Sequence, residues 1–382
     1  MSRYRWTILG LGAAAQGSYA AIFLGLPVLA PALQAEYELS LTGIGVVLAA
    51  PNFGSVATLL AWGLAADRFG ERVVLGAGLL VAGTALAAAA FAPETGVLVA
   101  ALAVAGAAGA SVNAASGRAV MGWFDPAERG FALALRQTSN PLAGVLAAVA
   151  LPPIVAAGGL RAGLLALAGL CAATATAGVV GLREAPPGPE VGPHIGHPLR
   201  DTRIWRVSAG SGLLVLAQMS ILSFTVLFLH GERGLSTAAA AGVLAGIQAA
   251  GAVLRIAAGR WSDRLGARIA PLLRLSFAFA AGLALTAALA SAPLALLVPA
   301  LLVAGALSQS WNGLSFTATA EIAGRARSGA ALGFQQTSLA VAAAVATPVF
   351  AATVEASSWG IAFGLAALLP LAGARLVRRI AV

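Results

Sequence analysis

A charged turn that occurs twice in an otherwise apolar chain restricts the fold of this sequence more than any other feature. The first copy, GLAADRFGER, covers residues 63–72, and the second, GRWSDRLGAR, covers residues 259–268. The two copies share Gly, Asp, Arg, Gly and Arg at matched positions, and each lies between two long apolar runs. Because the copies are about half a chain apart, they predict a duplicated membrane bundle with two similar halves.

The composition agrees with a membrane protein. Apolar residues make up 59% of the chain and charged residues only 10%, whereas soluble domains carry roughly 25% charged residues. With about 20 residues for each membrane crossing, 382 residues leave room for about twelve helices and short loops. The alternating pattern of β-barrel strands is absent, so the prediction is an all-α integral membrane protein.

The basic residues, all of them arginine, predict the orientation of the chain. Most lie in the N-terminal segment, the even-numbered loops and the C-terminal segment, and only Arg161 and Arg233 lie in the opposite loops. By the positive-inside rule this places both termini in the cytoplasm. Topology therefore explains the net charge of +9, and we expect no nucleic-acid partner.

The sequence divides into two halves joined by a polar segment. We predict an N-terminal six-helix half at 1–182, a cytoplasmic linker rich in Pro and Gly at 183–204, and a C-terminal six-helix half at 205–382. Polar residues of the first half recur in the same order in the second. The matched pairs are Gln16 with Gln218, Asn52 with Gln248, Asn113 with Asn312, and Arg136 with Gln335.

Polar side chains within membrane spans are costly unless they face the protein interior or a watery cavity. Arg136 lies about 12 Å along its predicted helix, with no acidic residue at comparable depth. Its planar guanidinium suits carboxylate, sulfonate or phosphate, and Asn140 shares its helix face. We predict that Arg136 anchors the substrate; the alternative is a structural arginine held by backbone carbonyls and amides.

The other predicted substrate-binding residues are polar or aromatic residues of the spans. For the amides, hydrogen bonding between helices is the structural alternative. The predicted set comprises Gln16, Tyr19, Asn52, Asn113, Arg118, Arg136, Asn140, Gln218, Gln248, Asn312 and Gln335.

Both charged turns resemble the signature loop of the major facilitator superfamily, G-x-L-a-D-r-x-G-r-[kr]. The resemblance implies twelve transmembrane helices in two pseudo-symmetric halves and secondary transport by alternating access. It also implies that the aspartates bind helix N-termini of the opposite half, in loops that latch and release. The gating residues would be Gly63, Asp67, Arg68, Gly70 and Arg72, and in the second copy Gly259, Asp263, Arg264, Gly266 and Arg268.

Two further stretches resemble different branches of this superfamily. Residues 118–130 resemble the R-x-x-x-x-W-F-P-x-x-E-R-G stretch of the organic-anion branch, with Asp125 where Pro is usual, which implies that Arg118 meets a substrate carboxylate. A structural role of Arg118 is an equal alternative. Residues 140–144 resemble a degraded G-P-x-x-G-G motif of drug/proton antiporters. A small organic anion is therefore the predicted substrate, and a proton-coupled drug or metabolite efflux antiporter is the alternative.

Arg255 and Glu321 are predicted near the cytoplasmic ends of their spans. They could pair with each other or link to the adjacent signature loop, and Glu321 is the one candidate proton carrier. Many relatives couple through a carboxylate on helix 1 or 4, and none is present here. The expected coupling partner is thus a proton or a counter-anion. We expect the protein to be a monomer in a bacterial inner membrane.

The sequence gives little support to other classes of function. Without lysine there is no G-x-x-x-x-G-K phosphate-binding loop. The histidines and the lone Cys171 form no pattern of a nucleophile or a metal site. We therefore expect neither an enzyme nor a bound cofactor or metal. A membrane sensor that does not transport is a second alternative, and no signalling domain supports it.

Overall fold

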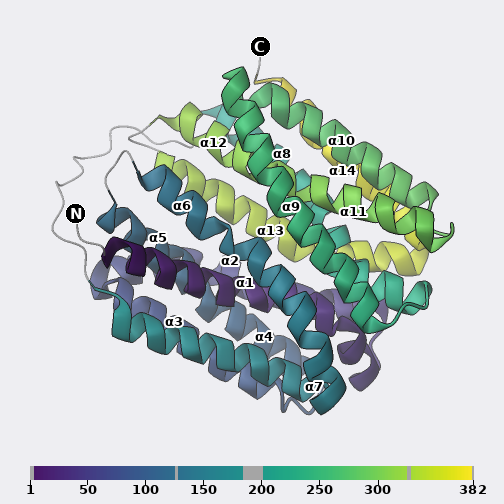
Figure 1. Ribbon diagram of the computed structural model, residues 1–382, viewed down its shortest axis with the longest axis horizontal. Helices are drawn as coiled ribbons and strands as arrows, with labels where there is room; N and C mark the ends of the chain where they lie inside the picture. The colour runs from purple at the N-terminus through teal and green to yellow at the C-terminus, as the bar shows by residue number, and fades with distance from the viewer. Residues whose placement is uncertain (1–3, 125–127, 184–200, 325–327, 381–382) are drawn as a thin grey trace. The chain divides into compact units, whose positions relative to one another are not determined.

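The computed structural model of the protein describes residues 4–124, 128–183, 201–324 and 328–380, apart from a few side chains within helices, that of Asp67 among them (Figure 1). These residues form helices joined by short turns, so the predicted all-α fold is confirmed. The first helices are α1 (Tyr4–Glu36), α2 (Leu41–Phe69), α3 (Glu71–Ala89), α4 (Thr95–Gly109), α5 (Ser111–Trp123), α6 (Arg129–Gln137) and α7 (Ser139–Gly181). The remaining helices are α8 (Thr202–Leu227), η2 (Phe228–Glu232), α9 (Thr237–Leu265), α10 (Ile269–Ala288), α11 (Leu294–Ser310), α12 (Asn312–Ala323), α13 (Ser328–Ala356) and α14 (Trp359–Arg378).

Eleven stretches of the described chain are long and apolar enough to cross a membrane. One of them, Leu135–Gly181, consists of two helices joined at Gly159, whose positive φ of 70° interrupts the helical backbone. The stretches therefore account for twelve crossings. Large apolar side chains such as Leu146, Val149 and Val253 are more than half exposed, as is expected of a surface that faces lipid.

Three of the predicted crossing helices are broken near their middles. The breaks fall at Ala110 between α4 and α5, at Thr138 between α6 and α7, and at Trp311 between α11 and α12. Pro141 explains the second break, because its ring nitrogen cannot donate to the carbonyl of Gln137. At the matched position of the second half stands Ala340, and α13 runs without interruption.

The chain separates into two contact units. Unit 1 contains residues 1–39 and 46–191, and unit 2 contains residues 40–45 and 192–382. Within unit 1, α1 packs most extensively against α7, as the purple and teal ribbons of Figure 1 show. Within unit 2, α10 packs against α14 and α9 against α11. Most of the predicted linker, residues 184–200, lies outside the described residues.

Helices α2 and α4 touch backbone to backbone through two glycines. A Cβ atom on Gly54 would lie 1.8 Å from the carbonyl oxygen of Ala103, and one on Gly106 would lie 2.0 Å from the carbonyl oxygen of Pro51. No real side-chain atom tolerates such distances. Small residues of this kind allow membrane helices to approach closely.

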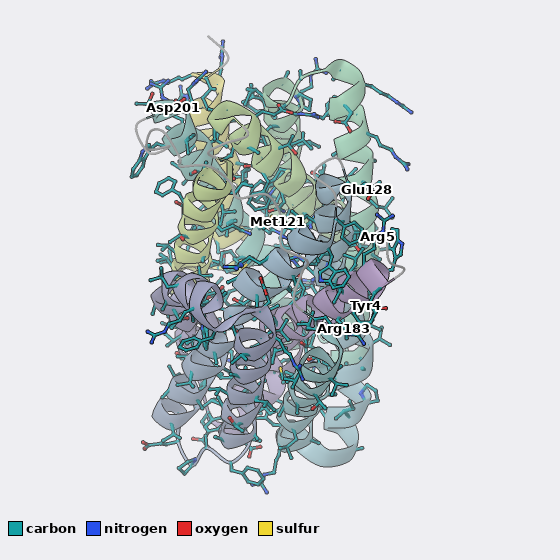
Figure 2. The ribbon with its side chains drawn as sticks, turned by 90° about the vertical axis from the view of Figure 1, so that its left-hand side faces the viewer. Tyr4, Arg5, Met121, Glu128, Arg183 and Asp201 are labelled. Carbon is teal, nitrogen blue, oxygen red and sulfur yellow. The ribbon has the colours of Figure 1, made fainter. Side chains whose placement is uncertain are left out.

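The first turn of α1 contacts two distant parts of the chain within unit 1. The Tyr4 hydroxyl donates to the carbonyl oxygen of Gly181 at 2.6 Å, and the Arg183 guanidinium lies 4.4 Å from the Tyr4 ring centre. Arg5 forms an ion pair with Glu128 at 2.6 Å, just before α6 begins. Figure 2 labels Tyr4, Arg5, Glu128 and Arg183, which lie in one region of unit 1. The contacts thus join the first helix, the start of α6 and the end of α7.

Candidate functional site

Arg136 lies next to the break between α6 and α7 and is the most deeply buried of the described arginines of unit 1. Its side chain is only 6% exposed. Its Nη1 donates to Gln16 Oε1 on α1 and to Ser116 Oγ on α5, both at 2.7 Å. Its Nε is buried and finds no hydrogen-bond partner among the described residues. The guanidinium therefore retains unused donor capacity inside the bundle.

The contacts of Arg136 continue into a small network of neutral groups. Gln16 Nε2 donates to Asn140 Oδ1 at 3.1 Å, and Asn140 Nδ2 donates to Gln137 Oε1 at 3.1 Å. We call Gln16, Ser116, Arg136 and Asn140 the Arg136 network. In the described part of unit 1, the ion pairs are made by Arg5 and Arg118, not by Arg136. A buried cation without a counter-ion is costly unless an anion joins it.

Unit 2 repeats this arrangement without the charge. Gln335 is fully buried, and its Nε2 donates to Ser315 Oγ at 2.6 Å and more weakly to Ser211 Oγ at 3.5 Å. Gln335 and Ser315 occupy the positions that match Arg136 and Ser116. The duplicated scaffold therefore holds a polar side chain at the same place in both units, and only unit 1 places a cation there.

The other predicted site residues are not drawn into the Arg136 network. The Tyr19 hydroxyl pairs with Ser55 Oγ at 2.9 Å, and Asn312 Nδ2 donates to the carbonyl oxygen of Gln309 at 3.3 Å. Gln248 is buried with an unpartnered Oε1. In the described chain, no side-chain hydrogen bond is made by Asn52, Asn113 or Gln218.

Sequence reasoning did not assign Ser116 or Gln309 to a site. The recurrence of Ser116 as Ser315, at the spacing that relates Arg136 to Gln335, was the available signal for the serine. No such signal existed for Gln309, because Ala110 stands at its matched position. Its carbonyl becomes an acceptor only because helix α11 ends one residue later.

Arg118 lies outside the Arg136 network. Its Nε donates to Glu71 Oε1 at 3.1 Å, and its side chain is 39% exposed. Glu71 is the first residue of α3, directly after Gly70 of the first signature loop. The contact joins α5 to that loop, so a structural ion pair accounts for the described geometry of Arg118.

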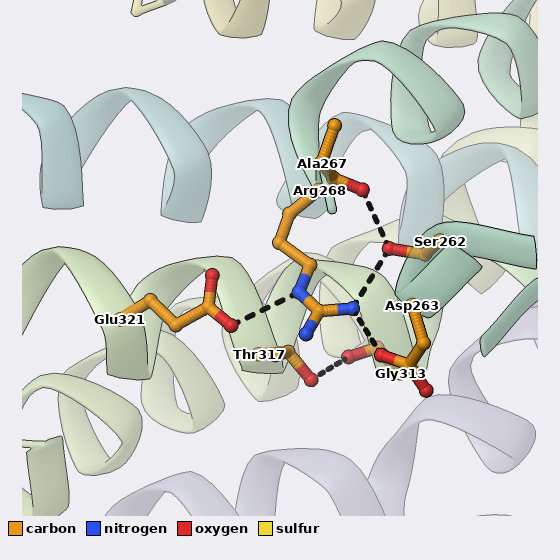
Figure 3. A network of polar contacts seen from close by, with 7 residues as sticks. All are labelled: Ser262, Asp263, Ala267, Arg268, Gly313, Thr317 and Glu321. Carbon is orange, nitrogen blue, oxygen red and sulfur yellow. Dashed lines mark hydrogen bonds and ion pairs between the residues drawn. The ribbon is translucent and has the colours of Figure 1, made fainter. Parts of the chain in front are cut away.

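The second signature loop is fastened in a related way (Figure 3). Arg268 Nη1 donates to Asp263 Oδ1 at 2.5 Å and to Ser262 Oγ at 3.0 Å, while its Nε donates to Glu321 Oε1 on α12 at 3.0 Å. The bond to Asp263, followed by Glu321, raises the pKa of Arg268 above its ordinary value. This arginine therefore keeps its charge across the physiological pH range.

The suggested ion pair between Arg255 and Glu321 is wrong, because Glu321 pairs with Arg268. The other suggestion, a link from Glu321 to the adjacent signature loop, agrees with the structure. Gly70 and Gly266, which match in the two loops, both have positive φ, 77° and 59°. Glycine is therefore required at this turn in each copy.

We expect Glu321→Gln to leave the pH dependence of transport unchanged. The Glu321 side chain is 54% exposed and already holds Arg268, whereas a proton carrier needs a site that opens alternately to the two sides. Because exposed ion pairs contribute about 0–1 kcal/mol, the thermal midpoint should change little. Flux into proteoliposomes at several pH values measures this. A pH profile that flattens in the variant would assign coupling to Glu321 after all.

A cavity of about 500 Å³ lies between α1 and the two parts of α7 in unit 1, and it is open on the lipid-facing side, where Leu142 and Leu146 are exposed. Its walls are almost wholly apolar and include Gly17, Leu142, Leu146 and Leu170, with Ser139 at one end. None of the predicted site residues lines it. Gly17 and Ser139 are, however, the chain neighbours of Gln16 and Asn140, so the cavity borders the Arg136 network.

Comparison with known proteins agrees with this description. The family model for the Major Facilitator Superfamily matches residues 11–347. Two MFS-type transporters described as uncharacterized, from two strains of Mycobacterium tuberculosis, are each 34% identical over 378 residues, covering 98% of this chain and 84% of the relative.

Solved transporter structures share the fold. A bacterial homologue of the human lysosomal transporter Spinster, inward-facing and occupied, aligns with a TM-score of 0.80 at 14% identity over 99% of this chain and 97% of that one. A D-xylose–proton symporter aligns at 0.78 with 15% identity, covering 96% and 97%. The nucleoside transporter NupG aligns at 0.76 with 14% identity, covering 97% and 99%. Identities this low show a common fold and carry no information about the substrate.

Proposed function

The chain belongs to the major facilitator superfamily and is a multi-pass membrane transporter, and we propose that its substrate is a small organic anion. Arg136 carries this proposal. It is buried, it contacts only neutral groups, and its Nε has no partner in the described chain. A carboxylate would complete the hydrogen bonds of the guanidinium and cancel its charge.

The proposed mechanism uses the duplicated halves as moving parts. Alternating access would expose the anion at Arg136 to each side of a bacterial inner membrane in turn. The ion pairs Arg118–Glu71 and Arg268–Glu321 support a role of the signature loops in this movement, because each pair ties a loop to the neighbouring broken helix of its own unit. With no acidic group bonded to Arg136 among the described residues, exchange against another anion fits the network better than proton symport.

The second candidate is a proton-coupled exporter of lipophilic compounds. The apolar cavity between α1 and α7 favours it, because about 500 Å³ of apolar space suits a drug-sized molecule. The degraded antiporter motif at residues 140–144 lies beside this cavity. On this alternative, Arg136 would be a structural residue that holds α1, α5 and α6 together.

A ligand panel separates the two candidates. The purified full chain is heated with acetate, benzoate, succinate or phosphate at constant ionic strength, and separately with the lipophilic cation tetraphenylphosphonium. The anion proposal expects a saturable rise of the thermal midpoint with at least one anion. Counterflow of that radiolabelled anion into proteoliposomes then tests transport. Stabilisation by tetraphenylphosphonium alone would support the exporter and overturn the anion proposal.

A further inference from the structure

Unit 2 also holds an arginine within a span, and this partly buried side chain lies deeper than its sequence position indicates. The prediction placed Arg255 near the end of its span. Its Nε in fact donates to the carbonyl oxygen of Gln309 at 3.2 Å. Gln309 is about 22 Å from the start and about 21 Å from the end of the span Leu294–Ala323. The guanidinium therefore lies level with the middle of this span, at the break between α11 and α12.

The rest of the Arg255 guanidinium is unused. In the described chain its only hydrogen bond is the one from Nε, and the ion pairs of unit 2 are made by Arg203 and Arg268. Nη1 and Nη2 therefore carry four N–H donors without a protein acceptor. A cation in the middle of a membrane span needs either an acceptor or a water-filled space.

Two other buried polar groups without partners lie on α9 and at the same break. Gln248, two turns before Arg255 on α9, is 1% exposed, and its Oε1 has no partner. Trp311, at the break itself, is 1% exposed, and its indole Nε1 has no acceptor among the described residues. Gly251 makes room for the Gln309 side chain, since a Cβ atom there would lie 2.6 Å from Gln309 Nε2. We call Gln248, Arg255, Gln309, Trp311 and Asn312 the Arg255 cluster.

The backbone carbonyl oxygens at such a helix break can be hydrogen-bonded without a charged donor. In unit 1 the carbonyl oxygen that matches that of Gln309 belongs to Ala110 and accepts from the backbone N–H of Asn113 at 3.1 Å. The nearby carbonyl oxygen of Ala107 accepts from Thr58 Oγ1 at 2.7 Å and from Trp62 Nε1 at 2.6 Å, both neutral. The unit 1 residue that matches Arg255 is Leu59. The positive charge of Arg255 is therefore an addition made in unit 2 alone, beyond what the scaffold needs.

We propose that the Arg255 cluster is a second anion-binding site, contained in unit 2 and separate from the Arg136 network of unit 1. The donors that lack partners, Arg255 Nη1 and Nη2 and Trp311 Nε1, suit an oxyanion such as a carboxylate or a phosphate. The inference extends the proposed function, because it assigns a second anionic group to the transported chemistry. The contacts of each site lie within its own unit.

Trp311 provides a local signal for the test. The full-length protein in nanodiscs is titrated with succinate, acetate or inorganic phosphate at constant ionic strength, and tryptophan fluorescence and the thermal midpoint are recorded. The variants are Arg136→Gln, Arg255→Gln, the double variant, and Arg274→Gln, which removes one arginine of unit 2 outside the cluster. Trp311→Phe identifies the part of the fluorescence change that arises at the cluster.

The Arg136→Gln variant should keep a fluorescence response to at least one of these anions, and adding Arg255→Gln should weaken its apparent affinity at least tenfold. Arg274→Gln should behave like wild type. A response that Arg255→Gln leaves unchanged in both backgrounds would overturn the inference while leaving the Arg136 proposal intact. A response abolished by Arg255→Gln and unaffected by Arg136→Gln would support the inference and overturn the Arg136 proposal. If Arg255→Gln does not fold, Arg255→Lys should bind about tenfold more weakly, and equal affinity would count against the site.

Discussion

Arg136→Gln should weaken anion binding at the Arg136 network without weakening the fold. The variant gives unit 1 the residue that unit 2 already holds at the matched position, where Gln335 donates to Ser315 as Arg136 does to Ser116. The loss of a charge-assisted contact of about 2–5 kcal/mol lowers affinity roughly 30-fold to 4000-fold. Because an uncompensated buried cation is removed, the thermal midpoint without ligand should be equal to or above that of wild type.

The matched control is Gln335→Ala, which removes a buried polar residue without touching the charge. It should lower the thermal midpoint, because Ser211 and Ser315 lose the bonds from Gln335 Nε2 and keep only the bond to each other. It should leave anion affinity within a few-fold of wild type. Anion affinity is measured by the shift of the midpoint with ligand concentration and confirmed by flux. If Arg136→Gln destabilised the protein and bound every anion with the affinity of wild type, the arginine would be a structural residue.

Gly106→Ala should strongly destabilise the α2–α4 contact. The added methyl group would lie 2.0 Å from the backbone oxygen of Pro51, which cannot turn aside as a side chain could. Overpacking costs typically 1–3 kcal/mol and occasionally more, so we expect a loss of about 3 kcal/mol. The yield of monodisperse protein and the thermal midpoint both report it.

Gly169→Ala on α7 is the matched control, because nothing lies within 4 Å of a Cβ atom at that position. Its midpoint should equal that of wild type or rise slightly, since alanine has the higher helix propensity. Equal midpoints for the two variants would mean that α2 and α4 separate easily, and the close approach would not contribute to stability.

The sequence predicted the twelve crossings well, because each is a long apolar run and the charged turns mark the repeat. The breaks within spans were harder to foresee. Pro141 marks the one at Thr138, whereas Ala110 and Trp311 have no proline three residues further on. A local pattern of apolar residues contains no information about where such breaks fall.

The candidate site could be predicted in part. Arg136, Gln16 and Asn140 were expected together and lie in one hydrogen-bonded network. Arg255 was misjudged because its distance from the end of the span was counted along the helix. A long side chain can place its charge well away from its own Cα atom. The partner of Arg255 is a backbone oxygen, which no side-chain pattern reveals.

The fastening of α1 also has a consequence for the synthesis of the chain. Tyr4 is among the first residues to leave the ribosome, yet its partners, the Gly181 carbonyl and Arg183, are made almost 180 residues later. Until then, α1 lies in the membrane without these contacts at its beginning. Once Arg183 has been added, the contacts of Tyr4 with Gly181 and Arg183 can form before α8 to α14 have been synthesised. Translation thus has a natural halfway point, at which a finished first half can serve as the platform for the second.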